Sequence, residues 1–263
     1  MTITDHELAA RLADSAGEVL LSLREEIGEA PYEPRELKTQ ADAAAQRRLA
    51  ELLAELAPGD AVLSEEARDD LARLDADRVW IIDPLDGTKE YSERDDAGVW
   101  RDDWAVHVAL WTKQDGLTAG AVALPARGLT LHTGQQIAPR SKPGEKLRVA
   151  VSRSHPSSFV KAVLEALDAE PVAMGSAGVK AISVVNGTVD AYVHAGGQYQ
   201  WDSAAPVAVA RHAGMFTSRI DGTPIVYNRR DLSVPDLIVC DEDVVDSVQS
   251  AVAHALSLEG QDS

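Results

Sequence analysis

The stretch from Val79 to Tyr91 constrains this chain more than any other. It begins with an apolar, β-prone run, which ends in a turn containing Pro84 and Gly87. The turn carries two carboxylates, Asp83 and Asp86, three residues apart. Carboxylate and carbonyl oxygens suit Mg²⁺, whereas zinc and copper favour nitrogen and sulfur ligands. The sequence therefore predicts a strand that ends in a site for a hard divalent cation.

The charge balance excludes several classes of partner. A formal net charge of -18 over 263 residues makes most of the surface repel nucleic acid and anionic membranes. The negative net charge still allows a small anionic substrate, because metal ions and local cations can make the electrostatic potential in a cleft positive. The single Cys240 cannot form an internal disulfide, and no apolar run is long enough to span a bilayer. We expect a soluble cytoplasmic protein with no nucleic-acid or membrane partner, and Cys240 as a small strand hydrophobe.

The first half of the chain, residues 1–140, has the pattern of two amphipathic helices followed by strands. The last three strands are separated by turn residues, which predicts an antiparallel meander. The charged stretch 93–103 predicts a mobile loop beside the aspartate turn. His107 and His132 are predicted to be structural, because neither has a partner histidine at metal-binding spacing. The expected helices are 3–26 and 40–56, and the expected strands besides the one at Val79 are 61–64, 104–111, 117–124 and 129–133.

The second half, residues 141–263, alternates strands with helices, which is typical of an α/β half with helices on both faces of a sheet. The polar segment 139–145, which contains Pro and Gly, marks the boundary between the halves. The expected strands are 147–151, 171–174, 190–194, 215–219 and 236–240, and the expected helices are 157–167, 179–186, 201–212 and 244–256.

Several acidic residues are ambiguous when each is considered alone. Asp42 lies in the first turn of the second expected helix, where a carboxylate complements the helix dipole. Glu65 and Glu66 follow a short expected strand, and only one of them can face inward, because side chains alternate along an extended chain. Asp202 lies at the start of an expected helix and is suited to be its N-cap.

The glycine-rich turn Gly175-Ser176-Ala177-Gly178 lies between an expected strand and an expected helix. The free N–H groups at that helix start are suited to bind a phosphate or another anion. A reading of equal weight makes the turn a plain connection in which Ser176 caps the helix. The spacing differs from the Gly-x-Ser-x-Gly nucleophile elbow, so Ser176 is not predicted to be a nucleophile.

Taken together, these motifs resemble those of the inositol monophosphatase superfamily of metal-dependent, lithium-sensitive phosphomonoesterases. The resemblance covers nearly the whole chain and rests on Ser64-Glu65-Glu66, Asp83-Pro84-Leu85-Asp86-Gly87-Thr88, Gly175-Ser176-Ala177-Gly178 and Trp201-Asp202-Ser203-Ala204-Ala205. The continuation Lys89-Glu90-Tyr91 is most similar to the CysQ branch, which dephosphorylates 3′-phosphoadenosine 5′-phosphate in sulfur assimilation. Inositol phosphates and fructose 1,6-bisphosphate are the alternative substrates. The implied fold is a layered α/β/α/β/α sandwich, with the site at the junction of the halves.

The resemblance implies a role for each residue of the site. Two or three Mg²⁺ ions would be bound by Glu65, Asp83, Asp86, Asp202 and the Leu85 carbonyl. Thr88 with Asp42 would orient and deprotonate the attacking water. The phosphate would contact the N–H groups of Gly87 and Thr88, and the rest of the substrate would contact Gly175, Ser176, Ala177, Gly178, Lys180 and Asp202. The implied partner is a small phosphorylated molecule, and the resemblance also allows a homodimer.

Two other classes of protein share parts of this pattern. A haloacid dehalogenase-type phosphatase also has an aspartate turn ending in Gly-Thr, but its carboxylates are two residues apart and one becomes phosphorylated. Asp83 and Asp86 are three residues apart. A non-catalytic acidic metal-binding module is the more distant alternative, and phosphate release with Mg²⁺ distinguishes an enzyme from it.

Overall fold

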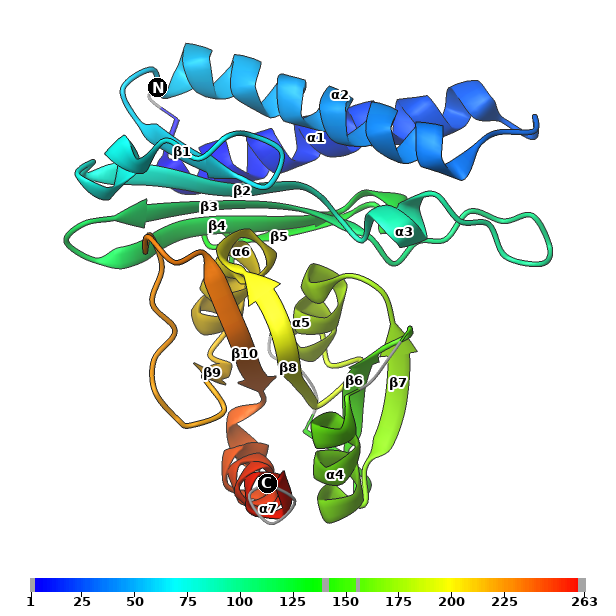
Figure 1. Ribbon diagram of the computed structural model, residues 1–263, viewed down its shortest axis with the longest axis vertical. Helices are drawn as coiled ribbons and strands as arrows, with labels where there is room; N and C mark the ends of the chain where they lie inside the picture. The colour runs from blue at the N-terminus through cyan, green and yellow to red at the C-terminus, as the bar shows by residue number, and fades with distance from the viewer. Residues whose placement is uncertain (1–2, 139–141, 155–156, 260–263) are drawn as a thin grey trace.

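The computed structural model describes residues 3–138, 142–154 and 157–259. Two helices, a five-stranded sheet, two helices, a second five-stranded sheet and two further helices follow one another as layers (Figure 1). This arrangement confirms the predicted α/β/α/β/α sandwich. None of the helices in the described ranges combines the length and the apolar character that a membrane span requires.

The first layer consists of α1 (Asp5–Ile27) and α2 (Pro34–Leu56), which lie side by side on the first sheet (Figure 1). A capping box between Thr4 and Glu7 begins α1. α2 begins at Pro34 rather than at residue 40, because proline fits the first helical turn, where its missing N–H would have no partner. Asp42 therefore lies well inside α2, and the reading of Asp42 as a first-turn carboxylate is wrong.

The first sheet has the strand order β1-β2-β3-β4-β5. β1 pairs with β2 in parallel, and the later strands are antiparallel, which confirms the predicted meander. Along β2, Trp80 and Ile82 face the first helical layer, whereas Val79 and Ile81 face the middle of the molecule. Asp83, two residues after Ile81, also faces the middle of the molecule. The strands are β1 (Ala61–Ser64), β2 (Arg78–Asp86), β3 (Ala105–Thr112), β4 (Gly116–Leu124) and β5 (Leu129–His132).

Short elements connect these strands. The segment after α3 (Thr88–Tyr91) folds back on itself through an isolated antiparallel bridge between Arg94 and Trp100, in the stretch expected to be an irregular loop. Besides α3, these are the 3-10 turns η1 (Leu71–Leu74) and η2 (Pro125–Arg127); a third 3-10 turn, η3 (Glu242–Val244), lies in the second half of the chain.

The second sheet has the order β7-β6-β8-β10-β9. β6 is parallel to β7 and β8, whereas β10 is antiparallel to β8 and β9. β8 continues past the predicted end through two glycines to Tyr199, because its pairing with β10 outweighs the low strand propensity of glycine. Cys240 is buried in β10, as predicted. The strands are β6 (Arg148–Ser152), β7 (Glu170–Met174), β8 (Ala191–Tyr199), β9 (Phe216–Ser218) and β10 (Ser233–Cys240).

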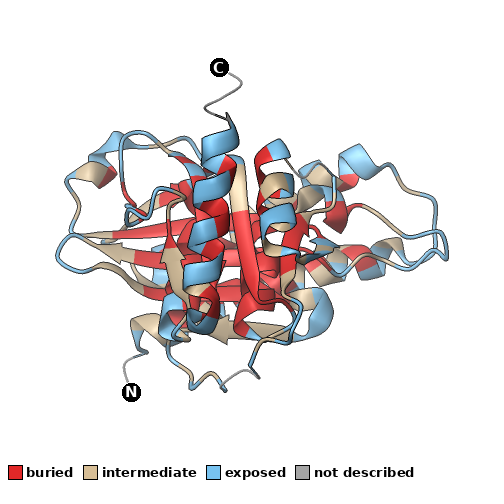
Figure 2. Ribbon diagram, turned by 90° about the horizontal axis from the view of Figure 1, so that it is seen from below, coloured by how far each residue is buried: buried red, intermediate tan, exposed pale blue. Residues whose placement is uncertain are grey.

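Helices cover both faces of the second sheet, as predicted. α5 (Ala177–Val185) and α6 (Gln200–His212) form the middle layer, and α4 (Ser158–Leu167) and α7 (Val245–Glu259) cover the outer face (Figure 1). Buried residues concentrate in the strands and on the inward sides of the helices (Figure 2). The middle core joins Ile81 of the first sheet to Ile182 of α5 and Leu237 of β10. The two halves therefore share one core; residues 139–141 of the boundary predicted at 139–145 lie outside the described residues.

Candidate active site

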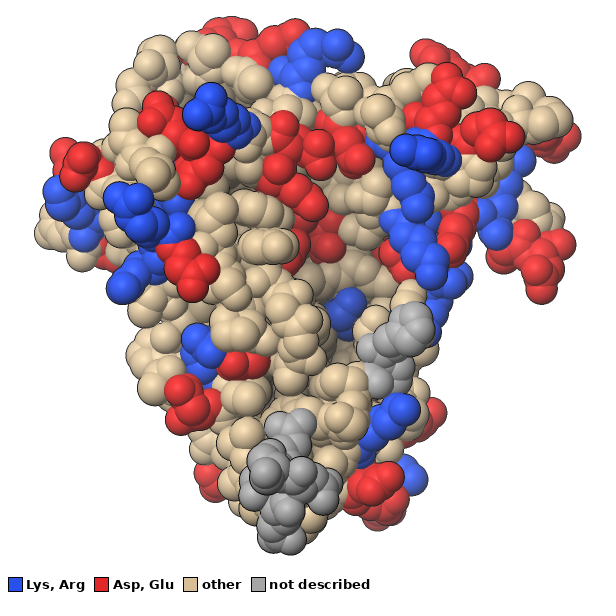
Figure 3. Space-filling view, viewed as in Figure 1, with Lys and Arg blue, Asp and Glu red and all other residues tan. Residues whose placement is uncertain are grey.

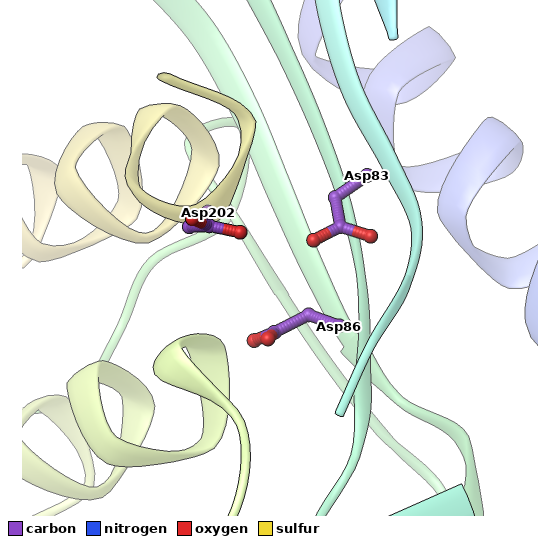
Figure 4. Close-up of side chains that lie close together, drawn as sticks. All are labelled: Asp83, Asp86 and Asp202. Atoms are coloured by element: carbon purple, nitrogen blue, oxygen red, sulfur yellow. The ribbon is translucent and has the colours of Figure 1, made fainter. Parts of the chain in front are cut away.

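Three aspartates meet between the two sheets (Figure 4). Asp83 and Asp86 come from the end of β2, and Asp202 from the first turn of α6. One carboxylate oxygen of each lies within 4.8 Å of the others. Asp83 is 1% exposed, and among the described residues no hydrogen bond reaches its Oδ2. A buried carboxylate oxygen without a donor is costly unless a cation binds it, so these residues fit a divalent metal ion.

A local irregularity in β2 turns both aspartates toward the middle layer. The pairing of β2 with β3 shifts register between Asp83 and Asp86. Without this bulge, residues three positions apart would face opposite sides of the sheet. The Leu85 N–H donates to Asp83 Oδ1 at 3.0 Å. Gly87 then adopts a φ of +89°, a left-handed conformation that glycine tolerates, and α3 begins at Thr88.

Burial and the crowded negative charge of their neighbours raise the pKa of Asp83 and of Asp202. For Asp83 the main cause is burial, followed by the charges of Glu65 and Asp86, and its pKa lies well above the ordinary value. Burial and then the charge of Asp86 raise the pKa of Asp202 to about 7. The Tyr199 N–H donates to Asp202 Oδ2 at 2.6 Å and only partly offsets these effects. A bound cation would favour the charged forms of Asp83 and Asp202 and so lower both pKa values.

Asp86 differs from its two neighbours, because donors surround it. Burial alone would raise its pKa, but contacts with His107, Ser176 and Gly178 outweigh burial and lower the pKa to about 2. The Gly178 N–H donates to Asp86 Oδ2 at 2.8 Å, and the Ser176 hydroxyl donates to the same oxygen. Asp86 therefore keeps its negative charge at neutral pH.

His107 is a neighbour of the site that sequence reasoning missed. It is fully buried, as expected of a structural histidine, but its Nε2 lies 3.2 Å from Asp86 Oδ2 and its Nδ1 lies 3.2 Å from the Trp201 carbonyl oxygen. Burial lowers the pKa of His107, but the charges of Asp86 and Asp202 and the contacts with Asp86 and the Trp201 carbonyl together outweigh burial, so the net shift is upward. Strand alternation could have identified His107 from the sequence, because it places His107 on the same face of its strand as Ala105 and Ala109, which belong to the middle core.

Glu65 and Asp42 border the three aspartates. Ser64, the last residue of β1, donates to Gln46 of α2 at 2.7 Å, whereas Glu65 lies in the turn that follows β1 and is exposed. Glu65 lies outside the group of oxygens within 4.8 Å, but its pKa is raised by partial desolvation and by the charges of Glu66, Asp86 and Asp42. Burial and the charge of Glu66 raise the pKa of Asp42 to about 6.

Thr88 and Asp42 are not hydrogen-bonded to each other in the described part of the chain. The Thr88 hydroxyl donates instead to the Leu85 carbonyl at 3.1 Å. A carbonyl oxygen has two lone pairs, so Leu85 retains one for another contact. The water-activating pair implied by the resemblance remains a prediction.

The glycine-rich turn acts as a helix cap. Ser176 Oγ accepts the Val179 N–H at 3.1 Å, and Ala177 is the first residue of α5. A Cβ on Gly178 would lie 2.1 Å from His107 Nε2, so only glycine fits there. Lys180 is buried below the turn and donates to the carbonyls of Gly175 and Ser176, at 3.2 and 2.6 Å. Asp202, by contrast, lies inside the first turn of α6 rather than at its N-cap.

Cations border the acidic cluster on the side of α3 (Figure 3). Arg153 Nη2 lies 2.9 Å from Glu90 Oε1 and 2.6 Å from Glu93 Oε2, while Lys89 Nζ lies 3.2 Å from Ser154 Oγ. Arg101 pairs with Asp103 at 2.5 Å. Sequence reasoning missed Arg153, because its partners are about 60 residues away in the chain.

The sequence matches the model of the inositol monophosphatase family over residues 4–253. A 3′-phosphoadenosine 5′-phosphate phosphatase of Mycobacterium leprae is 49% identical over 253 residues, which cover 92% of this chain and 91% of the relative. Inositol monophosphatase-II of Staphylococcus aureus has the same fold, with a TM-score of 0.74, 19% identity and 92% of each chain covered. CysQ of Bacteroides thetaiotaomicron has a TM-score of 0.70 and 26% identity, with 89% of this chain and 96% of that chain covered. These matches confirm the resemblance, and the chain belongs to the inositol monophosphatase family.

Proposed function

We propose that this protein is a Mg²⁺-dependent phosphatase of the CysQ type, which converts 3′-phosphoadenosine 5′-phosphate to AMP by removing the 3′-phosphate. The observation that carries the proposal is the meeting of Asp83, Asp86 and Asp202 around a buried carboxylate oxygen that no donor reaches among the described residues. The Mycobacterium leprae relative, which is 49% identical, supports the choice of substrate.

The acidic residues would hold two or three Mg²⁺ ions. Asp83, Asp86 and Asp202 would provide carboxylate oxygens, with Glu65 and the Leu85 carbonyl beside them. Bound Mg²⁺ would polarise the phosphate, lower the pKa of a water molecule and neutralise the leaving oxygen. Lithium sensitivity, a cytoplasmic location and a homodimer are further predictions from the family.

The surrounding residues would orient the water and the phosphate. The pKa of Asp42, about 6, suits a group that accepts a proton near neutral pH, and Thr88 would pass that proton from the water. The N–H groups of Gly87 and Thr88 at the start of α3 would donate to the phosphate oxygens. No residue forms a covalent intermediate in this scheme, because water attacks the phosphorus directly.

The Lys89-Glu90-Tyr91 continuation has a physical role that favours a substrate with a second anionic group. Glu90 is buried and holds Arg153 beside α3, while the Tyr91 hydroxyl anchors α3 to the Leu20 carbonyl at 2.7 Å. Lys89 stays exposed on the same side. Arg153 is already paired with Glu90 and Glu93, so the exposed ammonium of Lys89 is the group that would complement a bisphosphate better than the neutral ring of an inositol monophosphate.

The substrate is tested by measuring kcat/KM with Mg²⁺ for 3′-phosphoadenosine 5′-phosphate, inositol 1-phosphate and fructose 1,6-bisphosphate. We expect the nucleotide to be preferred by about 100-fold, less than the roughly 10⁴- to 10⁵-fold that buried polar groups left unpaired produce, because Lys89 is exposed. A preference for inositol 1-phosphate would overturn the CysQ assignment. Absence of phosphate release from all three would overturn the enzyme assignment, and a trapped phosphoaspartate on Asp83 would overturn the direct attack by water.

A further inference from the structure

The two oxygens of Asp86 have different surroundings. Oδ2 accepts the Gly178 N–H at 2.8 Å and the Ser176 hydroxyl, and His107 Nε2 lies 3.2 Å from it. Ser176 and Gly178 belong to the start of α5, whereas His107 belongs to β3. One carboxylate oxygen is thus in contact with polar atoms from two elements other than its own.

This arrangement leaves one oxygen of Asp86 for a metal ion. A carboxylate oxygen has about two lone-pair sites, and Ser176 and Gly178 already occupy those of Oδ2. Oδ1 is the oxygen that remains for a cation. The side chain cannot rotate to exchange its oxygens without breaking contacts to α5 and to β3.

His107 connects Asp86 with the other half of the site. Its Nδ1 lies 3.2 Å from the carbonyl oxygen of Trp201, the residue directly before Asp202. In the sheet it lies opposite Asp83 in register. The ring is fully buried and packs closely against the start of α5, where a Cβ on Gly178 would lie 2.1 Å from Nε2. One rigid, buried ring therefore touches Asp86 and the backbone that carries Asp202.

We propose that His107 is a positioning residue of the metal site: its ring packs against Asp86 Oδ2, which Ser176 and Gly178 already hydrogen-bond, so that Asp86 keeps Oδ1 for the metal and its place relative to Asp202. The inference rests on the proposed function only in that the acidic cluster binds a divalent cation. Residues that orient metal ligands commonly change metal affinity about 10- to 100-fold when they are replaced.

The test measures metal binding directly, on the full chain without substrate. Binding of Mg²⁺ is followed by calorimetry and binding of Mn²⁺ by electron paramagnetic resonance, for wild type, His107→Leu and His107→Gln. Leucine fills much of the space without a polar atom, and we expect about tenfold weaker binding. Glutamine places an amide near the position of Nε2 and should recover part of the affinity. His132→Gln is the matched control, because His132 lies on β5 and outside the contacts of Asp86; it should bind as wild type.

Ser176→Ala provides a second test that leaves the histidine in place. It removes the hydroxyl that donates to Asp86 Oδ2 and should also weaken metal binding. If His107→Leu fails to fold, His107→Gln and Ser176→Ala decide, and wild-type affinity in both overturns the inference. In activity assays of His107→Gln, kcat at limiting Mg²⁺ should fall and return toward wild type at high Mg²⁺, with KM for the nucleotide unchanged.

A purely structural role for His107 predicts a different result. The melting temperature in EDTA would fall, while the affinity for Mg²⁺ would stay within about twofold of wild type, less than the change expected of a ligand-orienting residue. That result overturns the inference and leaves the proposed function intact. A wild-type protein that binds neither Mg²⁺ nor Mn²⁺ would overturn the proposed function, and the inference with it.

Discussion

At the scale of single residues, Asp83 and Asp86 show how one turn produces opposite environments. Asp86 is surrounded by donors, and its pKa is lowered to about 2. Asp83 is buried, its Oδ2 has no donor among the described residues, and its pKa is raised. Asp83 therefore destabilises the metal-free fold at neutral pH, whereas the contacts of Asp86 stabilise it.

Asp83→Asn should stabilise the metal-free protein and abolish its function. The change removes a buried negative charge, and a gain of about 1 kcal/mol would raise the melting temperature by about 2–4 °C in EDTA near pH 8. The rise in melting temperature on adding Mg²⁺ should disappear, and kcat should fall more than about 100-fold. A lower melting temperature in EDTA, or an unchanged response to Mg²⁺, would contradict this account.

Asp42→Asn tests the water-activating role that the resemblance assigns to α2. Loss of a general base costs about 10²- to 10⁴-fold in kcat, and KM should change little. The acid limb of the wild-type pH profile, expected near the Asp42 pKa of about 6, should be lost. Glu51→Gln, at an exposed position of the same helix, is the control. Equal pH profiles for wild type and Asp42→Asn would assign the proton transfer to another group.

The motif residues of the site were predictable from sequence, but their supporting contacts were not. Asp83 and Asp86 lie in one short segment, whereas alternation allows only one of Glu65 and Glu66 to face inward and does not choose between them, so Glu65 came from the resemblance. His107 meets Asp86 only because β3 pairs with β2 and α5 packs above both. Arg153 meets Glu90 only because the two halves come together. Contacts between distant segments leave no local spacing in the sequence.

At the scale of elements, a buried arginine of α1 holds the short helix that follows the aspartate turn. Arg24 Nε donates to the Tyr91 carbonyl at 3.0 Å, and its Nη1 donates to the Arg101 carbonyl at 2.7 Å. The guanidinium also lies 4.5 Å from the centroid of the Tyr91 ring and 5.0 Å from that of Trp104. A cation at the C-terminal end of α3 satisfies its carbonyls and fixes the start of α3 at Thr88.

Arg24→Met should therefore weaken both stability and catalysis. Hydrogen bonds to a charged group contribute about 1.5–3 kcal/mol each, so we expect a loss of at least about 3 kcal/mol in the free energy of unfolding. The kcat should fall because Thr88 loses its support. Arg11→Met, at an exposed position of α1, should match wild type. Chemical denaturation measures the loss; similar values for the two variants would show that Arg24 does not anchor α3.

Hydrophobic periodicity predicted most of the elements, and the errors have physical causes. The start of α2 was missed because proline and charged residues at 33–36 have the composition of a loop, although proline suits a first helical turn. The end of β8 was missed because Gly196 and Gly197 have low strand propensity, which pairing with β10 overrides. In both cases the interactions that decided the boundary are absent from the local pattern.

At the scale of the whole molecule, the site lies where the two sheets share a core. Asp83 and Asp86 are carried by the first sheet, while Asp202 starts a helix that packs against both sheets. Folding therefore brings like charges together in a chain that already has a net charge of -18. We expect the metal-free protein to be less stable for this reason, and divalent cations to be part of its stability.

The pH dependence of stability tests whether the crowded carboxylates destabilise the metal-free protein. Asp202 has a pKa of about 7 in the folded protein and an ordinary value near 3.8 when unfolded, so the folded state binds more protons between these values. Its contribution to stability is complete below about pH 4 and is lost as the pH rises through about 7. The raised pKa values of Asp83 and His107 act in the same direction. His194, with a pKa lowered to about 4 by burial, acts in the opposite direction, but only below about pH 6.5.

In EDTA, the melting temperature should therefore fall between about pH 6.5 and about pH 8. Cations bind the deprotonated carboxylates, so saturating Mg²⁺ should raise the melting temperature more at the upper pH than at the lower one and flatten the slope. Asp202→Asn should reduce the slope in EDTA. Asp221→Asn should leave it unchanged, because Asp221 is exposed and its pKa is lowered by the Thr223 hydroxyl and N–H. A slope that is equal with and without Mg²⁺, or unaffected by Asp202→Asn, would show that the crowded carboxylates do not govern the stability of this fold.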